Sequence, residues 1–331
     1  MFRVATFNVE NLDDKDNDKN PALSVRAPVL RSTLNRLQAD ILCLQEVHGQ
    51  ERADHTSANP SRELSALDFL LTGTPYFGYH QATTLTTDHV PYNLRNLVIL
   101  SAHPITKFAQ YRNDHIDALR YRKVTATDPP DIDAKDLGWE RPILYAQIEH
   151  PQLGTVHVLN LHLKSRLASH IPGQKTRFSW KSAAGWAEGY FLSSIKRVGQ
   201  ALETRILVDK LFDADVSAQI LVCGDFNAEP GEVPVEAICG RVENTSNPEL
   251  RSRVLVPCNS SIPSSIRFSH YHHGQGNLLD HMLISQSLLP YFRRSEIYNE
   301  NLHDESLPYT YDSKYPESDH AAFVSEFASA E

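Results

Sequence analysis

Five short apolar segments constrain the fold of this 331-residue chain more than any other feature of its sequence. Each is rich in Val, Ile, Leu or Cys without alternating polar residues, which is the pattern of β-strands covered on both faces. The segments are FRVATFN (2–8), DILCLQE (40–46), VHVLNLH (156–162), ILVCGDFN (220–227) and DHMLIS (280–285). We therefore expect sheets in the interior, with other elements packed against them.

Amphipathic helical patterns lie between these strand segments. Residues 24–38 place their apolar side chains on one stripe, and a third such pattern covers about 190–212. Residues 61–73 open with Ser61 before an apolar run and close on Gly73, a typical C-terminal cap. Strands that alternate with helices predict an α/β protein with sheet layers inside and helices outside.

No internal repeat and no linker rich in Gly, Ser or Pro divides the chain, so we expect a single domain over residues 1–331. The polar stretch 112–140 then becomes a long surface loop of that domain. The net charge of −9 argues against a protein that coats nucleic acid by bulk attraction. It leaves room for an enzyme with one local basic groove.

The cysteines and the N-terminus indicate a cytoplasmic protein. No pair of cysteines has CxxC spacing, so we expect buried thiols in a reducing compartment and no disulfide framework. The sequence begins with a strand pattern instead of a basic leader followed by an apolar segment, and no stretch is long enough to span a membrane. The four cysteines are Cys43, Cys223, Cys239 and Cys258.

Polar residues end or border each of the five strand segments. Taken singly, each has an ordinary structural explanation, as a turn former, a helix cap, a solvated charge or a hydrogen-bonded core histidine. Their occurrence together favours a functional site, because rigid sheets can hold side chains in fixed positions. The residues are Asn8, Glu46, His162, Asp225, Asn227 and Asp280.

The chemical inventory is that of metal-dependent hydrolysis at phosphorus. Glu46, Glu10 and Asp319 offer carboxylate oxygens to a hard divalent cation. Asp225 or His320 could act as the base for a nucleophilic water. Donors for the negative charge that develops on a phosphoryl group are Asn8, Asn227, His162 and Arg141. The G-x-S-x-G motif of serine hydrolases and the phosphate-binding P-loop motif are both missing from the sequence.

An ordered series of motifs closely resembles the endonuclease/exonuclease/phosphatase superfamily. The motifs are FNVENL, LCLQEV, ERPIL, NLHLKS, GDFNAEP, LLDHMLIS and SDHAAF, and they run from residue 2 to about 324. NLHLKSR and FSHYHHGQGNLLDHMLIS are most similar to the bacterial nuclease-like branch. The resemblance implies the deoxyribonuclease I-like fold, in which two packed mixed β-sheets flanked by helices form a four-layer α/β sandwich.

The resemblance implies a metal-binding side of the site. Glu46 would bind Mg²⁺ or Mn²⁺, and Glu10 and Asp319 would contribute further carboxylates. Asn8 would support the metal-binding carboxylate, and Arg141 would brace the site.

The resemblance also implies a set of reacting residues. Asp225 would orient or deprotonate the attacking water, and Asn227 would hold the scissile phosphate beside it. His320 is the second candidate for the base, with Asp280 as its carboxylate partner. His162 would contact the phosphoryl oxygens and could help the leaving oxygen to depart.

A basic segment follows directly after the strand that ends at His162. Residues 150–187 contain no Asp or Glu, although the chain as a whole has an acidic excess. The segment is either a locally basic loop or an arm that neutralises phosphates and offers stacking faces to bases, and its position favours the second interpretation. Its basic and aromatic residues are Lys164, Arg166, Lys175, Arg177, Lys181, Phe178, Trp180 and Trp186.

Two further positions carry separate expectations. Asn96 stands where many relatives have glycine, and we expect its side chain to narrow the space near the phosphate or to add a donor there. SHYHHG (269–274) could suggest zinc, but His270, His272 and His273 lack a second ligand group at a usable spacing. We therefore interpret this stretch as an edge segment beside the substrate.

These observations predict a divalent-metal-dependent phosphodiester hydrolase, most simply a nuclease that acts on DNA or RNA. One alternative is a phosphatase or phosphodiesterase acting on small or lipid-linked phosphates. A weaker alternative is a non-catalytic scaffold of the same fold, which is disfavoured because no expected catalytic position is substituted. The sequence predicts nucleic acid and no membrane as partner, and it leaves endo- or exonuclease action and the oligomeric state open.

Overall fold

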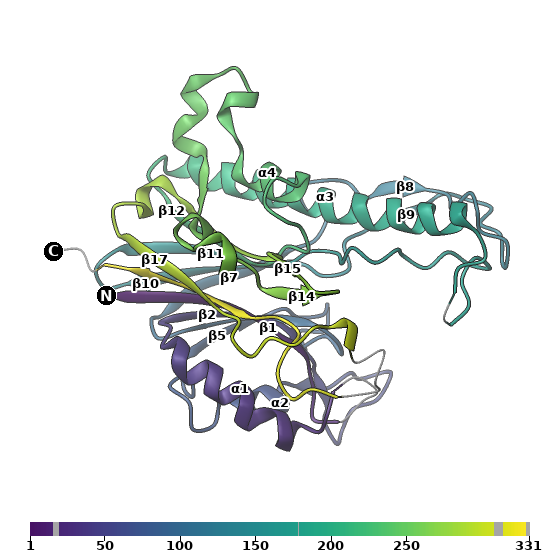
Figure 1. Cartoon of the computed structure of the whole chain (residues 1–331), viewed down its shortest axis with the longest axis horizontal. Coiled ribbons are helices and arrows are strands. Elements are labelled where there is room, and N and C mark those ends of the chain that lie inside the picture. Colours follow the sequence, from purple (N-terminus) through teal and green to yellow (C-terminus); the bar gives the residue numbers. More distant parts are fainter. Residues whose placement is uncertain (16–19, 178, 308–313, 329–331) are drawn as a thin grey trace.

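Two six-stranded sheets packed face to face form the centre of the protein (Figure 1). The computed structural model describes residues 1–15, 20–177, 179–307 and 314–328. The first sheet has the order β17 (Phe292–Tyr298), β18 (Ala322–Phe327), β1 (Phe2–Leu12), β2 (Ile41–Val47), β6 (Asn96–Ser101) and β5 (His80–Thr83). The second has the order β13 (Leu255–Pro257), β16 (Asp280–Ser285), β12 (Gln219–Asp225), β11 (Gly154–His162), β10 (Ile143–His150) and β7 (Ile105–Tyr111).

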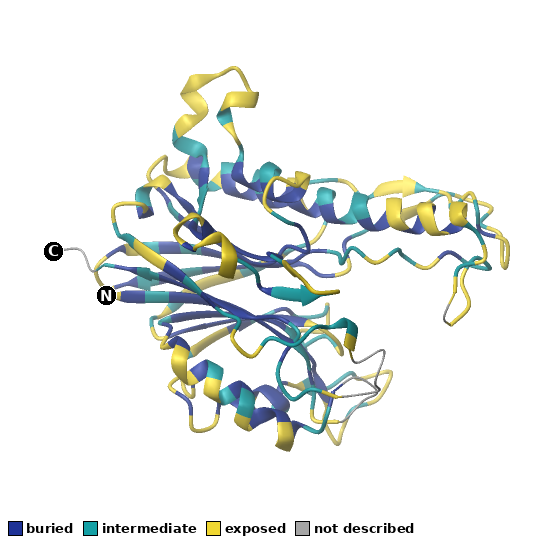
Figure 2. Cartoon of the chain, in the orientation of Figure 1, coloured by how far each residue is buried: buried dark blue, intermediate teal, exposed yellow. Residues whose placement is uncertain are grey.

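Helices cover the outer face of each sheet and complete a four-layer arrangement. The helices α1 (Leu23–Leu37) and α2 (Ser65–Leu71) pack on the first sheet, and α3 (Ala183–Ala214) and α4 (Val233–Cys239) pack on the second. A third apolar cluster fills the space between the two sheets. Figure 2 shows the strands mostly buried and the outward sides of the helices exposed. The predicted α/β sandwich is confirmed.

All five predicted strands are present, as β1, β2, β11, β12 and β16. The pairs β1–β2 and β11–β12 are parallel and the other neighbours in the two large sheets are antiparallel, so both sheets are mixed. Burial on both faces explains why the apolar residues of these strands do not alternate with polar ones.

The predicted helix over 61–73 is wrong at its beginning. The backbone of Ser61 accepts a hydrogen bond from the Arg52 amide and donates one to His55 Nδ1, so it belongs to the preceding loop. The next two residues form β4 (Arg62–Glu63), which pairs with β3 (Gln50–Glu51), and α2 begins only at Ser65 without a side-chain cap. At the other end Gly73 has a φ of 80°, as expected for a residue that follows a helix.

The N-terminal half of α3 projects from the body of the protein, away from both chain termini (Figure 1). Residues 112–140 and 164–182 accompany it, and we call these two segments together with residues 183–198 the arm. The stretch 112–140 is therefore not only a loop, because it contains the paired strands β8 (Leu119–Tyr121) and β9 (Lys135–Leu137). A small apolar cluster of Ala126, Ile171 and Leu192 lies inside the arm.

Two buried glutamates of α3 fasten the stretch 112–140 to the helix. Glu203 accepts hydrogen bonds from the backbone amides of Asn113 (3.1 Å) and Asp114 (2.7 Å). Glu188 accepts from the Tyr121 hydroxyl and the Thr125 amide, both at 2.9 Å. These bonds satisfy amides that have no strand or helix partner, so they stabilise the path of the arm.

The four cysteines are free and buried, as predicted. Among the helices of the described residues, none has the length and hydropathy required to cross a membrane.

Candidate active site

Three neighbouring strands of the second sheet place three of the predicted reacting residues in one row. His162 at the end of β11 lies opposite Asp225 at the end of β12, and Asp225 lies opposite Asp280 at the start of β16. The glycine before Asp225 permits this approach, because Gly224 has a φ of 133° and a Cβ there would lie 2.0 Å from the Leu161 carbonyl oxygen.

The carboxylate of Asp225 is the centre of the row. Its Oδ2 lies 3.2 Å from His162 Nε2 and 3.8 Å from His320 Nε2. Asn8 Nδ2 (3.2 Å) and Asn227 Nδ2 (3.0 Å) donate to the same oxygen, and the Asn227 amide donates to Oδ1 (2.9 Å). Burial alone would raise the pKa of Asp225, but His320, His162 and these donors hold it well below its ordinary value.

The two histidines have opposite electrostatic surroundings. Burial and the charge of Arg141 lower the pKa of His162, against the attraction of Asp225. Burial also acts to lower the pKa of His320, but Asp280 and Asp225 outweigh it and raise that pKa well above its ordinary value. His320 Nδ1 lies 2.7 Å from Asp280 Oδ2, which fixes the orientation of the ring.

The carboxylates of the metal-binding side come from irregular backbone. The pairing of β1 with β2 shifts between Asn8 and Leu12, and the pairing of β2 with β6 shifts between Leu44 and Val47. Non-glycine residues in left-handed conformations gather around the site, as is common at functional sites. They are Glu10 (φ 46°), Asn11 (φ 49°), Glu46 (φ 64°), Arg95 (φ 60°) and Asn227 (φ 49°).

The same carboxylates fit a divalent cation. The Asn11 amide donates to Glu46 and the Asp319 amide donates to Glu10, both at 3.0 Å. Burial and the charge of Asp319 raise the pKa of Glu10 to about 9, and burial together with Glu46 raises the pKa of Asp319. In Glu46 burial is outweighed by His162, Arg95 and Arg141, so its pKa is lowered. Neighbouring carboxylates repel one another when they are ionised together, and a bound cation offsets this repulsion.

Within the described part of the chain, two groups of three residues bring metal-ligating atoms within 4.8 Å of one another. The first is Asp225, Asp280 and His320, and the second is His270, Glu305 and Asp319. Neither contains Glu46 or Glu10, so the predicted set of three carboxylates is looser than these two groups.

Arg141 and α3 brace the end of β11. Arg141 Nη1 donates to the carbonyl oxygens of His162 (3.1 Å) and Leu163 (3.3 Å). Gln200 of α3 in turn donates to the Arg141 carbonyl oxygen (2.9 Å), and Arg197 of α3 donates to that of Lys164 (3.0 Å). The helix that carries the arm therefore also positions the site.

One cavity of about 610 Å³ joins these residues. It is lined by Asn8, Glu10, Glu46, Arg141, His162, Asp225, Asn227, Asp319 and His320. Asp280 is fully buried behind His320. The cavity also contains Arg95, Arg166, His270, His272 and Glu305. Arg166 could be predicted from the sequence because it belongs to the NLHLKSR motif, whereas Glu305 lies in no motif.

The expectation for Asn96 is wrong. Its side chain is fully buried and does not line the cavity. Nδ2 donates to the carbonyl oxygens of Val47 (3.0 Å) and Tyr92 (2.7 Å), and Oδ1 accepts from the Tyr92 amide (2.8 Å) and the Thr84 hydroxyl (3.2 Å). The amide group thus ties β2, β6 and the preceding loop together, and the neighbouring Arg95 is the residue that reaches the cavity.

The predicted substrate-binding residues divide into two groups. Lys164 and Arg166 lie near the cavity and are paired with acids: Lys164 Nζ is 3.6 Å from Glu140, and Arg166 Nη2 is 2.6 Å from Glu232. Lys175, Arg177 and Lys181 are exposed on the arm and do not line the cavity.

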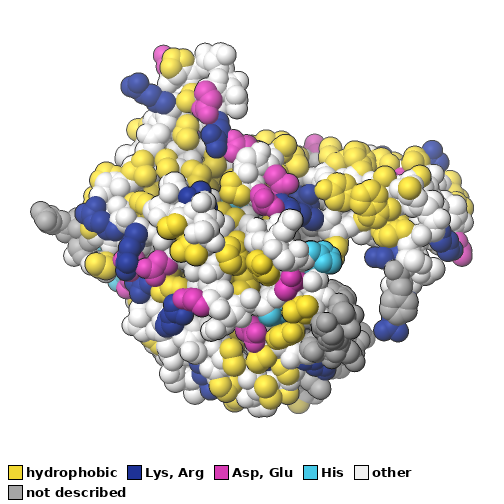
Figure 3. All heavy atoms as spheres, in the orientation of Figure 1, with side chains coloured by type: hydrophobic (Ala, Val, Ile, Leu, Met, Phe, Trp, Pro, Cys, Tyr) yellow, Lys and Arg dark blue, Asp and Glu magenta, His cyan; other side chains and the backbone are white. Residues whose placement is uncertain are grey.

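The aromatic residues of the arm differ in exposure. Trp180 is half-buried against the small cluster of the arm, with Lys175 Nζ 5.2 Å from its ring centre. Trp186 and Tyr190 on α3 stack with ring centres 5.4 Å apart and remain 47% and 43% exposed. Figure 3 shows hydrophobic side chains gathered on the arm over α3. Phe178 lies outside the described residues.

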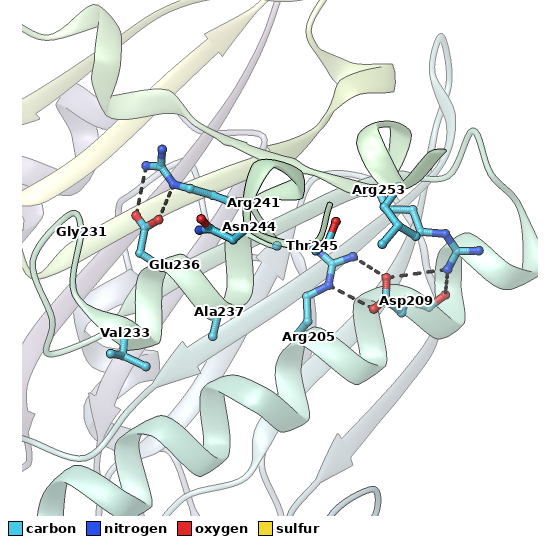
Figure 4. A pocket seen from close by; sticks show the side chains of 12 residues that line it. Arg205, Asp209, Gly231, Val233, Glu236, Ala237, Arg241, Asn244, Thr245 and Arg253 are labelled. Carbon is cyan, nitrogen blue, oxygen red and sulfur yellow. Dashed lines mark hydrogen bonds and ion pairs between the residues drawn. The ribbon is translucent and has the colours of Figure 1, made fainter. Parts of the chain in front are cut away.

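A second hollow of about 500 Å³ lies between α3 and α4 (Figure 4). Three arginines face it, but each is paired with a carboxylate. The pairs are Arg205 with Asp209, Arg241 with Glu236, and Arg253 with Asp213. Its positive charge is therefore neutralised, and it does not compete with the first cavity as a phosphate site.

Solved structures with the same fold include two phosphatases and TDP2. The 3′ phosphatase NExo from Neisseria, bound to a product DNA hairpin, is 16% identical with a TM-score of 0.53, covering 99% of each chain. Caenorhabditis elegans TDP2, in truncated form, is 15% identical with a TM-score of 0.56, covering 99% of this chain and 98% of its own. The mannosyl-6-phosphatase of Bacteroides thetaiotaomicron is 15% identical with a TM-score of 0.59, covering 99% and 100%.

Among curated proteins, none matches the sequence significantly. A family model described as Endonuclease/Exonuclease/phosphatase family matches residues 5–320, which include every residue of the row and every cavity carboxylate. The chain therefore belongs to the endonuclease/exonuclease/phosphatase family of phosphoester hydrolases.

Proposed function

We propose that this protein is a divalent-metal-dependent hydrolase of phosphodiester bonds in nucleic acid. The observation that carries the proposal is the position of Asp225 between His162 and His320 in a cavity that also contains Glu46 and Asp319. A carboxylate close to two imidazoles, with further carboxylates nearby, supplies both acid–base groups and metal ligands.

The residues have separate roles in this reaction. Asp225 orients the water that attacks phosphorus, and either Asp225 or the His320–Asp280 pair takes the proton of that water. His162 and Asn227 donate hydrogen bonds to the phosphoryl oxygens, whose negative charge increases as the fifth bond to phosphorus forms. Mg²⁺ or Mn²⁺, held by Glu46 with Glu10 and Asp319, would supply Lewis-acid stabilisation of the same charge.

Two observations support nucleic acid as the substrate class. The arm overhangs an open space beside the body (Figure 3). Lys175, Arg177 and Lys181 are exposed on the arm. A polyanion needs several separated cationic contacts of this kind, whereas a small phosphate needs one compact site. In addition, NExo, which shares the fold, binds a DNA hairpin.

A phosphatase acting on small phosphates is the second candidate. The mannosyl-6-phosphatase has the higher TM-score of the two phosphatases, and the guanidinium-bearing residues Arg95 and Arg141 line the cavity. The hydrolytic chemistry is the same in both candidates, so only the substrate range distinguishes them.

The test is hydrolysis of labelled single-stranded DNA, double-stranded DNA, RNA, a generic phosphodiester and a sugar phosphate, each with and without Mg²⁺ or Mn²⁺. We expect metal-dependent cleavage of at least one nucleic acid. We also expect that nucleic acid to be turned over faster than any other of the five substrates. Asp225→Asn should abolish it, while the exposed Asp54→Asn should not. Metal-dependent turnover of the sugar phosphate alone would overturn the nucleic-acid proposal.

A further inference from the structure

The short hairpin at the mouth of the cavity presents two histidines on one side. The hairpin consists of β14 (His270–His272) and β15 (Gln275–Asn277). His270 and His272 alternate along a strand and so share a face, and their rings lie 6.0 Å apart with an interplanar angle of 28°. Both line the cavity.

A carboxylate from a distant part of the sequence meets both rings. Glu305 Oε2 lies 3.1 Å from His270 Nε2 and 3.3 Å from His272 Nδ1. In the folded chain Glu305 thus supplies a second candidate ligand group for the SHYHHG motif, which its sequence spacing does not supply.

Backbone contacts hold Glu305 in this position. Its amide donates to the carbonyl oxygen of Tyr271, the residue between the two histidines (2.9 Å). The preceding Asp304 accepts from the amides of His273 (3.1 Å) and Gly274 (2.7 Å) in the hairpin turn. The carboxylate is therefore positioned by the hairpin itself, and a ligand set that is organised before binding loses less entropy when a metal binds.

Asp319 supplies a second carboxylate. Ligand atoms of His270, Glu305 and Asp319 all lie within 4.8 Å of one another. Two carboxylates and two imidazoles thus lie together in a half-buried group, and a cation would compensate the negative charge of the carboxylates.

We propose that His270, Glu305 and Asp319, joined by His272 through its position beside Glu305, bind a divalent transition-metal ion of the Zn²⁺, Co²⁺ or Mn²⁺ class. Two imidazole nitrogens and two carboxylate oxygens suit these ions, whereas the oxygen-only set of Glu46 and Glu10 suits Mg²⁺ or Mn²⁺. The ion would lie at the same cavity and share Asp319 with the carboxylate set. Its binding does not depend on the proposed hydrolysis.

The test is equilibrium dialysis of the full chain against Co²⁺, combined with the ligand-field absorption of the bound ion. His272→Ala is the first variant, because the side chain is 39% exposed and its removal leaves no cavity in the core. We expect it to weaken Co²⁺ binding at this site by more than about tenfold. Glu305→Gln, which keeps the size of the side chain, should have a similar effect.

Two controls separate this site from the other. Glu46→Gln should leave the nitrogen-ligated Co²⁺ spectrum in place, and so should His80→Ala, an exposed histidine that does not line the cavity. If His272→Ala and Glu305→Gln, folded by circular dichroism, bind Co²⁺ as the unmodified protein does, Glu305 only pairs with the histidines and the proposal is wrong. Co²⁺ binding in a protein that hydrolyses no phosphodiester would refute the proposed function and leave this site standing.

Discussion

The cavity and the arm hold their polar side chains in opposite ways. In the cavity, Asp225 and His162 are 1% and 3% exposed at the ends of strands that two packed sheets keep in register. In the arm, Lys175 and Lys181 are exposed on a segment supported by one helix and a small apolar cluster. Charges in the cavity consequently act on one another, whereas those of the arm are solvated and act separately.

The difference indicates that the hydrolytic chemistry depends on the cavity and that the choice of substrate depends on the arm. Coupled, buried groups can perform one reaction on any phosphoester that reaches them. Separate, exposed charges add up over the length of a ligand, so the arm would select the substrate. A change in the cavity should therefore affect all substrates alike, and a change in the arm should affect only long ones.

Removal of the metal should have the largest effect and should be confined to the cavity. EDTA should abolish hydrolysis, because the charge on the phosphoryl group loses its counter-ion, and Mg²⁺ or Mn²⁺ should restore it. Glu46→Gln should raise the metal concentration required for half-maximal rate. Nucleic-acid binding, measured by fluorescence anisotropy, should persist in EDTA. Full turnover in EDTA would show that the carboxylates of the cavity serve another purpose.

Loss of a reacting residue should come next. Asp225→Ala, His162→Ala and His320→Ala should each lower kcat by about 10³-fold or more on every substrate, and pairs of these changes should be far less than additive. Each variant should remain folded, since His162 and Asp225 lie at strand ends and His320 lies just before β18. Thermal unfolding and single-turnover kinetics check both statements, with exposed Asp54→Ala as the control. A variant with nearly normal turnover would remove its residue from the reacting set.

Glu188→Gln should loosen the arm without changing the chemistry. Replacing the carboxylate weakens its bonds to Tyr121 and Thr125, at a local cost of about 1–3 kcal/mol. Hydrogen exchange should rise in the arm and not in β11 or β12, and exposed Glu249→Gln should change neither.

The same carboxylate gives a pH dependence. Burial would raise the pKa of Glu188, but its donors, led by Thr125, outweigh burial and lower it. Its stabilising effect is thus complete above the ordinary glutamate pKa of about 4.3 and is lost as the pH falls through the lowered value. Arm exchange in the unmodified protein should rise in that acid range, and the Glu188→Gln variant should lack this step.

The smallest effect is expected from the exposed charges. Replacing Lys175, Arg177 and Lys181 with Ala should weaken binding of nucleic acid and flatten a log–log salt dependence that three phosphate contacts would set at roughly −2 to −3. Turnover of a minimal phosphodiester should hardly change. A matched triple change of Lys107, Lys210 and Arg293, which are exposed elsewhere, should leave the slope unchanged. If turnover of nucleic acid and of the minimal phosphodiester fell equally, the arm would support the cavity itself. The proposed division of roles between cavity and arm would then be wrong.

The row formed by His162, Asp225 and Asp280 was predictable as a cluster, because apolar strands that end in polar groups indicate a site. His162, Asp225 and Asp280 follow directly from this pattern and from the resemblance. Glu305 was not predictable, because it reaches His270 through a contact between segments 35 residues apart. The wrong expectation for Asn96 has a similar cause, since sequence does not show that a polar side chain points into the fold.

The arm was only half predicted. The apolar pattern over 190–212 marks the part of α3 that packs on the sheet, but the helix begins at Ala183, capped by the side chain of Ser182. Its first turns cover no sheet and so have no apolar stripe to indicate them. These turns are helical because they pack against the segment 164–182, and such a tertiary contact is not visible in the sequence.

Because α3 is continuous, it sets a fixed distance between the active-site cavity and the end of the arm. Arg197 donates to the carbonyl oxygen of Lys164, just after β11, and the same helix runs without interruption to Ala183 in the arm. The rise of an α-helix sets this span at about 20 Å, which is about six nucleotide steps along a strand. A shorter oligonucleotide could occupy the cavity or the far end of the arm, but not both. The length of the oligonucleotide, more than its base sequence, would then decide which nucleic acids bind tightly enough to be cut.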